Sequence, residues 1–258
     1  MNDESGAAEE EDDDGGRMTL IEHLTELRTR LIICLIAVAV CATVMFFLYN
    51  RVLSFLSGPY EHVTRGDRAC GGTRNTGCDL IATGPLDPFL VRLKVAGYGG
   101  LALAVPIIFW EIWRFVTPGL RKNERRYAVG FAVSAVVLFL LGAVVGWFTL
   151  IPALDFLLHV GGSIQPLLAA DKYLTLVALI FVAFGVAFEF PLLIVFLLLA
   201  RVINTRQLRH ARRWMAVGIT VFAAVITPSQ DPFSLLFMAI PMYLFYEIAI
   251  IIGRILKR

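Results

Sequence analysis

Long apolar stretches recur along this 258-residue chain and restrict the folds that it can adopt. The first of them, residues 31–49, contains no charged side chain at all. A helix needs about 20 apolar residues to cross a bilayer core about 30 Å thick, and four of the stretches reach that length. The mean hydropathy of +0.73 and the apolar share of 58% are typical of membrane proteins rather than water-soluble domains. The sequence therefore predicts an all-α, polytopic membrane protein.

Six transmembrane helices are predicted, although two of them are unusual. The predicted spans are 31–49, 89–116, 127–158, 173–200, 214–226 and 233–256. The fifth is short, because 13 residues give only about 20 Å of helix at about 1.5 Å per residue. The sixth reaches full length only by including Glu247 and Arg254. Pro106 and Pro241 lie inside the second and sixth spans, and we expect them to bend these helices into a concave wall.

The placement of Lys and Arg predicts the orientation of these spans. Bases gather after the second span, after the fourth span and at the C-terminus, which by the positive-inside rule are cytoplasmic. The prediction is N-in and C-in, in a bacterial plasma membrane, with 50–88 as the first outer loop. Arg92 and Lys94 oppose this pattern near the outer end of span two, and we expect both to snorkel outward.

Two segments differ in composition from the membrane domain, which is predicted as one unit over residues 18–258. Residues 1–17 carry eight acidic side chains among Gly and Ala, so they are predicted to be a disordered cytoplasmic tail. Cys70 and Cys78 lie in the first outer loop, where an oxidising compartment favours a disulfide. Two free thiols are the alternative.

Carboxylates at the cytoplasmic boundary are the first candidate functional groups. Residues 18–30 have helical apolar spacing and a polar face, which predicts a helix lying in the membrane interface before span one. Glu26 lies on it, and Glu124 lies in the basic loop 117–126. Each acid has a structural alternative, for Glu26 an i,i+4 pair with Arg30 and for Glu124 a local pair within its loop. Together they predict a receptor for paired cations, with arginine as the natural guest.

Several motifs agree in order and spacing with one known family. They are His-Leu-Thr-Glu-Leu-Arg at 23–28, Pro59, Pro106, the loop 115–126, Phe-Glu-Phe-Pro at 188–191, Ile-Thr-Pro at 226–228 with Asp231, and Ala-Ile-Pro-Met-Tyr at 239–243 with Glu247. Over residues 20–252 the chain resembles TatC, the multispan subunit of the twin-arginine protein translocase. The acidic tail and the cysteine-bearing loop lie outside that family pattern.

The resemblance implies a function for these positions. It implies that Glu26 and Glu124 bind the Arg-Arg motif of signal peptides on folded precursors. His23, Arg28, Arg125 and Arg126 would shape that signal-peptide site. It also implies a multimeric complex with single-span TatA- and TatB-type subunits, driven by the proton gradient.

Acidic and proline residues deeper in the chain give further candidates. Glu189 is placed near the middle of span four beside Pro191, so it is expected to face protein or a wet cavity. The alternatives are a hydrogen-bonded structural acid or, as the resemblance implies, a docking point for a partner helix. Glu247 is a further docking candidate. Structural roles are predicted as the alternative for Glu247 and for Glu111, each of which either snorkels or pairs, Glu247 with Arg254 and Glu111 with Arg114. Asp231, a candidate cap of span six, and Pro59 are predicted to be structural residues of the outer face.

Other functional classes fit the sequence less well. A secondary transporter or channel for a small solute is the main alternative, but no internal repeat is apparent. The spans contain neither the HExxH motif nor the Gly-x-Gly-Asp motif of intramembrane proteases. Nucleotide-binding glycine motifs and metal-ligand spacings are also absent, so we expect no cofactor, no metal and no enzymatic activity. Membrane lipid is an expected partner, and nucleic acid is not.

Overall fold

The computed structural model describes residues 20–65, 80–116, 128–160, 168–199, 202–229 and 231–255. Within these ranges the regular secondary structure is helical, apart from an isolated bridge between Ile81 and Ala169, and short turns connect the helices. The helices are α1 Leu20–Phe47, α2 Tyr49–Val63, α3 Asp87–Val116, α4 Ala128–His159, α5 Ala170–Phe188, α6 Phe190–Leu199, α7 Thr205–Ile226 and α8 Pro232–Ile255. The predicted all-α class is confirmed.

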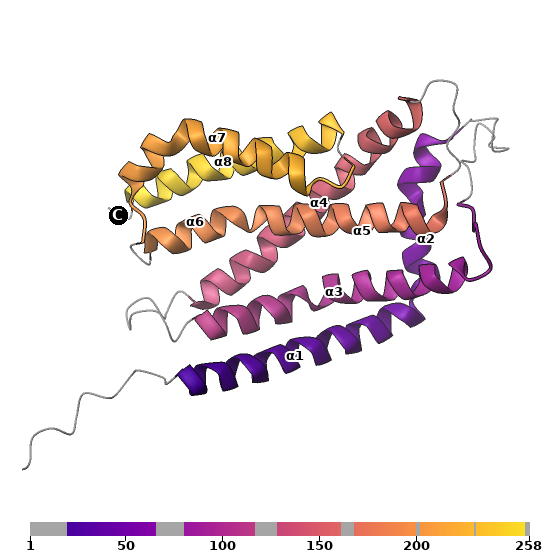
Figure 1. Cartoon of the computed structure of the whole chain (residues 1–258), viewed down its shortest axis with the longest axis horizontal. Helices are drawn as coiled ribbons and strands as arrows, with labels where there is room; N and C mark the ends of the chain where they lie inside the picture. Colours follow the sequence, from indigo (N-terminus) through magenta and orange to yellow (C-terminus); the bar gives the residue numbers. More distant parts are fainter. Residues whose placement is uncertain are drawn as a thin grey trace, which may run out of the picture.

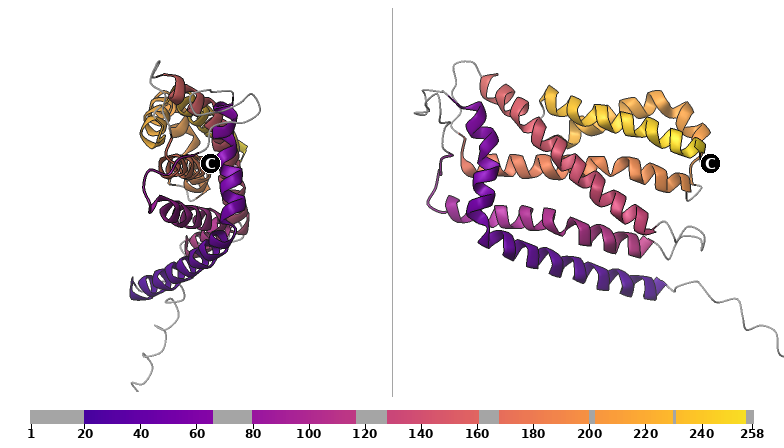
Figure 2. Two further views of the ribbon diagram at one scale, coloured as in Figure 1. Left: turned by 90° about the vertical axis from the view of Figure 1, so that its right-hand side faces the viewer. Right: turned by 180° about the vertical axis from the view of Figure 1, so that it is seen from behind.

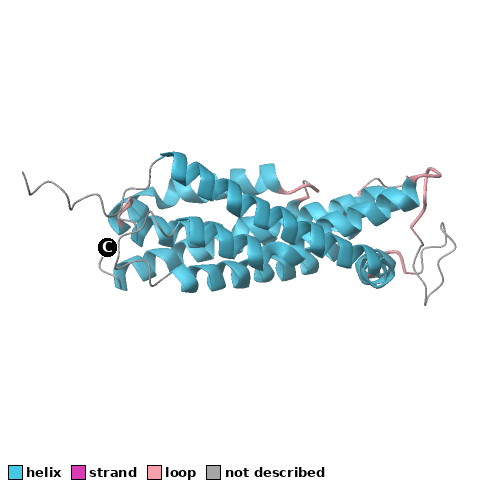
Figure 3. Cartoon of the chain, turned by 90° about the horizontal axis from the view of Figure 1, so that it is seen from below, coloured by secondary structure: helices cyan, strands magenta, loops and turns pink. Residues whose placement is uncertain are grey.

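Most of the helices run along the long axis of the molecule (Figure 1). The start of α1, the end of α3, the start of α4 and the end of α8 share one end, here called the Glu26 end. The start of α3 and the start of α5 lie at the opposite end, here called the Asp87 end. The exception is α2, which runs across the other helices and is seen end-on when the molecule is viewed from below (Figure 3).

Five helical segments are long and apolar enough to cross a membrane. They are His23–Phe47, Asp87–Phe115, Val129–His159, Ala170–Leu199 and Pro232–Arg254. The predicted short fifth span differs most, because α7 begins at Thr205 and has 22 residues. A capping box between Asn204 and Gln207 starts this helix. Arginines occupy the first half of α7. This helix is therefore long enough to cross a membrane, but it is not apolar enough to do so.

The beginning of the chain corrects two predictions. No separate interfacial helix precedes span one, because α1 continues without a break from Leu20 to Phe47. This stretch contains neither Gly nor Pro, so nothing interrupts its backbone hydrogen bonds. The first outer loop was also predicted without a helix, but α2 occupies residues 49–63 and includes Pro59.

Burial of aromatic side chains fixes α2 on the bundle. Tyr60 is buried in the main core, where its ring lies 5.6 Å from that of Tyr173 on α5. The Tyr173 hydroxyl donates to the Leu56 carbonyl oxygen at 2.6 Å. A similar bond joins α8 to α7, where the Tyr246 hydroxyl donates to the Leu208 carbonyl oxygen at 2.6 Å. Buried tyrosines thus connect neighbouring helices while their polar ends are satisfied.

In contrast, α1 lies at the edge of the bundle (Figures 1 and 2). It runs antiparallel to α3 and packs against it from one end to the other. Close approach is possible because Gly100 on α3 faces the backbone of Ala42. Large apolar side chains of α1, such as Leu24, Leu31 and Leu35, remain exposed on its other faces, as expected of a helix surrounded by lipid.

Candidate functional site

An ion-pair cluster joins α1 to α3 at the Glu26 end of the molecule. The Arg30 guanidinium donates through Nε to Glu26 Oε1 at 3.0 Å and also through Nη2 to the same oxygen. Its third nitrogen, Nη1, donates to Glu111 Oε2 at 2.8 Å. The i,i+4 pair of Glu26 with Arg30 is therefore present, but Arg30 also connects two helices.

The three side chains of this cluster are largely shielded. Glu26 retains 19% of its side-chain exposure, Arg30 retains 15% and Glu111 only 8%. Two carboxylates share one guanidinium, so the cluster has a formal charge of −1. Glu26 Oε2 is buried and has no hydrogen-bond partner among the described residues. A buried carboxylate oxygen without a donor is costly, so the geometry favours the arrival of a further donor or cation.

The predicted pairing of Glu111 with Arg114 was wrong. Both residues are on α3, and sequence spacing alone made Arg114 the nearest base. The antiparallel packing of α1 brings Arg30 to Glu111 instead. Sequence reasoning therefore missed Glu111 as a member of this cluster. The signal that could have revealed it is an acid and a base near the same end of two adjacent antiparallel helices.

His23 and Arg28 lie on the same helix as Glu26, but in different settings. The His23 ring stacks on Phe115 of α3, with ring centroids 4.4 Å apart. This stacking adds an aromatic contact between α1 and α3 close to the Glu26 cluster. Arg28 is exposed. His23 is exposed as well, so both residues border the accessible surface at this end.

Several predicted residues lie outside the described residues. They are Glu124, Arg125 and Arg126 of the loop after α3, and Cys70 and Cys78 of the first outer loop. The helices that flank the first of these segments are described, since α3 ends at Val116 and α4 begins at Ala128, both at the Glu26 end (Figure 1). Cys34 and Cys41, within α1, are free thiols.

Glu189 occupies a break in the predicted fourth span. It is half-buried between the end of α5 and the start of α6, and its backbone N–H donates to the Val186 carbonyl oxygen at 3.1 Å. Two residues later Pro191 has no N–H to continue the helical ladder, which explains why the helix divides here. Glu189 Oε1 is buried and has no hydrogen-bond partner among the described residues.

An apolar pocket of about 620 Å³ lies beside this break, between α4, α6 and α8. Pro191, Phe131 and Phe245 are among its lining residues. A pocket with such a lining is suited to apolar guests such as lipid chains or a helix face. Pro191 thus belongs both to the helix break and to this pocket.

Glu247 on α8 pairs with a different base from the one predicted. Its Oε2 accepts from Arg212 Nη2 of α7 at 2.7 Å, and its Oε1 accepts from the Tyr243 hydroxyl at 3.3 Å. Arg254 is not its partner, because α7 packs along α8 and places Arg212 closer. Glu247 therefore contributes to the contact between α7 and α8.

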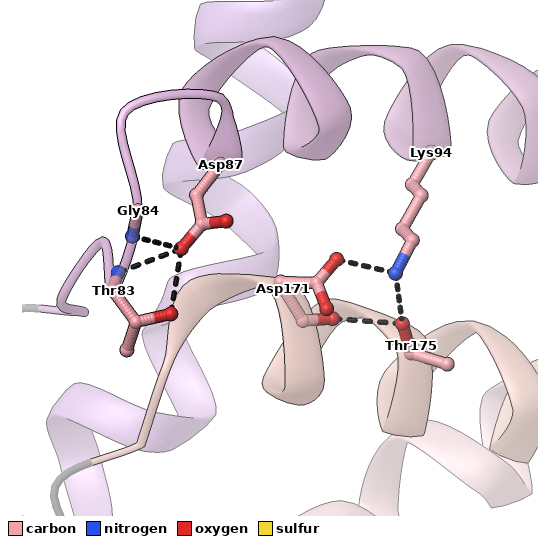
Figure 4. Close-up of polar contacts among 6 residues, drawn as sticks. All are labelled: Thr83, Gly84, Asp87, Lys94, Asp171 and Thr175. Carbon is pink, nitrogen blue, oxygen red and sulfur yellow. Dashed lines mark hydrogen bonds and ion pairs between the residues drawn. The ribbon is translucent and has the colours of Figure 1, made fainter.

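The polar residues at the Asp87 end also differ from expectation (Figure 4). Lys94 of α3 forms an ion pair with Asp171 of α5 and donates to the Thr175 hydroxyl at 3.0 Å. Arg92 lies over the Phe46 ring, 4.2 Å from its centroid, and donates to the Phe46 carbonyl oxygen at 3.3 Å. Neither base snorkels freely, because partners on α1 and α5 are within reach.

Two acids, Asp87 and Asp231, organise the starts of α3 and α8. Asp87 Oδ2 accepts from the Thr83 hydroxyl at 2.7 Å and from the Gly84 backbone N–H at 2.8 Å, fixing the turn before α3 (Figure 4). Asp231 is buried, and its Oδ1 accepts from the Ser234 backbone N–H at 2.7 Å. This is the hydrogen bond of a helix cap at the start of α8.

No cluster of three or more His, Cys, Asp or Glu side chains suited to a metal ion occurs in the part of the chain that the structure describes. Among the described residues, the ion pairs between helices are those of the Glu26 cluster, Glu247 with Arg212, and Lys94 with Asp171, and Glu189 is a half-buried acid. Of these, the Glu26 cluster combines a net negative charge with a carboxylate oxygen to which no described residue donates. It is the best candidate site for a cationic guest.

Comparison with known proteins identifies relatives of this chain. The family model described as "Sec-independent protein translocase protein (TatC)" matches residues 22–241. A Sec-independent protein translocase protein TatC of Frankia casuarinae is 40% identical over 92% of this chain and 66% of its own length. One of Corynebacterium kroppenstedtii is 39% identical over 94% of this chain and 63% of its own length. The chain thus spans slightly less than two thirds of these two relatives.

Other relatives match over nearly their whole length. A TatC protein of Aquifex aeolicus is 34% identical, covering 93% of this chain and 97% of its own. A crystal structure described as "Twin Arginine Translocase Receptor- TatC" superposes with a TM-score of 0.72 at 34% identity. That match covers 92% of this chain and 100% of the other, so the helical arrangement is shared along almost the whole chain.

Proposed function

This chain belongs to the TatC family of Sec-independent protein translocase proteins, which are not enzymes, and from that premise we propose that it is the signal-peptide receptor of a twin-arginine translocase. In this proposal, the Arg-Arg motif of a folded precursor binds at the cytoplasmic end of α1. Glu26 and Glu124 each engage one arginine, and His23, Arg28, Arg125 and Arg126 shape the surrounding surface. The word "receptor" in the description of the related crystal structure agrees with this role.

The single observation that carries the proposal is the state of Glu26. Its carboxylate is one-fifth exposed, and its second oxygen is buried without a donor among the described residues. A guanidinium offers paired donors in a planar fork, which suits a carboxylate in this state better than a lysine ammonium does. Glu124 is included because of its place in the chain. It belongs to the segment that connects the end of α3 to the start of α4, and both of these lie at the Glu26 end.

The direct test compares two peptides on the full chain in lipid nanodiscs. We expect a signal peptide with an Arg-Arg pair to bind tightly and a Lys-Lys version of the same peptide to bind at least about tenfold more weakly, since Lys lacks the bidentate contact. Fluorescence anisotropy of a labelled peptide would measure both. Equal affinity for the two peptides would contradict the proposal.

Orientation forms a second part of the proposal. We propose six spans, α7 being the fifth, with both termini in the cytoplasm of a bacterial plasma membrane. Exposed bases at the start of α7 and the end of α8 support this, namely Arg206, Arg209 and Arg254, because the end of α8 lies at the Glu26 end. Single cysteines placed at residue 28 and at residue 61 should then label from opposite sides of the membrane in a chain without its native cysteines. Labelling from one side would disprove this topology.

Partner binding forms the third part. We propose that single-span TatA- or TatB-type subunits dock near Glu189 and Pro191, with Glu247 a further candidate contact. The support is a half-buried acid without a donor among the described residues, next to an apolar pocket. We expect Glu189→Leu to reduce crosslinking from α5 and α6 to a partner helix by severalfold, because a buried polar contact is lost. Arg-Arg peptide binding should be retained, and unchanged crosslinking would contradict the assignment.

A small-solute transporter or channel remains the competing function. Such a protein would catalyse uptake in liposomes containing this chain alone, without any precursor protein. We expect no uptake of solutes in that experiment. A saturable flux would favour the transporter.

A further inference from the structure

We propose that Arg30 is an internal competitor for the signal peptide, occupying Glu26 until an arginine of the peptide displaces it. Glu111 then keeps Arg30 paired on α3. This inference rests on the proposed function, and it adds a mechanism by which the site selects arginine over other cations.

The first support is the way in which Arg30 divides its donors. Nε and Nη2 both point to one oxygen of Glu26, while Nη1 points to Glu111 at 2.8 Å. The guanidinium therefore already offers Glu26 the paired contact that a guest arginine would offer. Glu26 Oε2 has no donor among the described residues, but a guest guanidinium that engages both carboxylate oxygens in a fork must also take Oε1 from Arg30.

The second support is that Arg30 stays paired with Glu111 after it leaves Glu26. Glu111 is the most buried member of the cluster, with 8% side-chain exposure, and it lies on the neighbouring helix rather than on α1. Removing a buried arginine from all its partners would be strongly unfavourable. Because Glu111 keeps it paired, displacement from Glu26 costs only part of its interactions.

The third support is the balance of charge. Two carboxylates and one guanidinium give a formal charge of −1, so one additional cation brings the cluster to neutrality. With the guest bound, each carboxylate would have its own guanidinium, Glu26 that of the peptide and Glu111 that of Arg30. Without Glu111, the guest would place two arginines against one acid.

Competition of this kind sharpens specificity. A lysine ammonium is a compact point charge without a planar fork, so it replaces the two donors of Arg30 poorly. A guest arginine replaces them with equivalent donors. Competition by Arg30 therefore lowers the affinity for a lysine peptide more than the affinity for an arginine peptide. This is selection against the wrong ligand.

The test is the double variant Arg30→Gln/Glu111→Gln. It removes one positive and one negative charge, so the formal charge stays at −1 and only the competition is removed. We expect the Arg-Arg peptide to bind about tenfold more tightly, the change that follows from loss of one competing charge-assisted contact. The preference for Arg-Arg over Lys-Lys should become smaller.

The matched control is Lys94→Gln/Asp171→Asn, which removes an ion pair between α3 and α5 at the Asp87 end, away from the proposed site. We expect this control to leave peptide affinity unchanged. Should the first double variant not purify as a well-folded protein, Arg30→Lys gives the same comparison. It keeps the charge but weakens the competitor, so binding should again tighten, by less than in the double variant.

The outcomes separate this inference from the proposed function. If Glu26→Gln abolishes peptide binding but neither Arg30 variant tightens it, Arg30 only positions Glu26 and the inference is overturned. If Glu26→Gln leaves binding intact, the receptor proposal itself fails. Tighter binding together with a smaller preference for arginine supports both.

Discussion

Replacing Glu26 and Glu124 together with alanine should abolish binding of an Arg-Arg signal peptide. Each acid is proposed to form a charge-assisted contact with one arginine, and such contacts contribute about 1.5–3 kcal/mol each. Loss of both corresponds to at least about a hundredfold lower affinity. The measurement is peptide anisotropy on the full chain in nanodiscs, with membrane insertion checked by the amount of protein recovered.

A control with the same change in charge is available at the other end of the molecule. Glu61 of α2 and Asp155 of α4 are exposed acids near the Asp87 end, where they bond to Ser57 and His159. Glu61→Ala/Asp155→Ala should leave peptide affinity unchanged, because both residues lie far along the bundle from Glu26. If the control weakened binding as much as the test variant, general charge rather than a defined site would attract the peptide.

Hydropathy was sufficient to predict the long helices. The predicted spans 89–116 and 127–158 lie within two residues of α3 and α4, because a run of apolar residues in a membrane has only the helix as a solution. The family was also predicted correctly, from motifs spread over the chain. Both inferences rest on local patterns that persist over many residues.

The helix predictions that were wrong concern features that depend on packing between segments distant in the sequence. The predicted outer loop 50–88 contains no helix, yet α2 forms there, because burial of Tyr60 against Tyr173 stabilises it. The predicted fifth span covers only 214–226, whereas α7 begins at Thr205, because hydropathy detects the apolar second half of this helix but not its charged first turns. Pro191 was recognised, but the division into α5 and α6 was not.

In the candidate site, too, contacts within one helix could be predicted from the sequence, whereas contacts between helices could not. Glu26 and its pair with Arg30 could be predicted, since residues four apart meet on any helix. Glu111 could not, because its pairing with Arg30 depends on how α1 and α3 are aligned, and no local pattern contains that register. The same reasoning explains Glu247, whose partner Arg212 comes from another helix.

Because that alignment determines the site, a valine at Gly100 should damage both the fold and the function. A Cβ atom built at Gly100 would lie 2.5 Å from the Cα and the backbone nitrogen of Ala42, and a backbone cannot rotate away as a side chain can. The Gly100→Val variant must therefore separate α1 from α3. Overpacking costs about 1–3 kcal/mol where a core can adjust, so a backbone clash should cost at least as much. We expect a clearly lower melting temperature.

Gly97 provides the matched control for this variant, because a Cβ there meets nothing within 4 Å and the residue is exposed. It lies on the same helix three residues earlier, so Gly97→Val changes helix propensity equally while leaving the contact with α1 intact. Only Gly100→Val should also weaken Arg-Arg peptide binding, since Arg30 and Glu111 would no longer meet across the two helices. Equal melting temperatures and equal peptide affinities for the two variants would show that the close packing of α1 on α3 does not hold the cluster together.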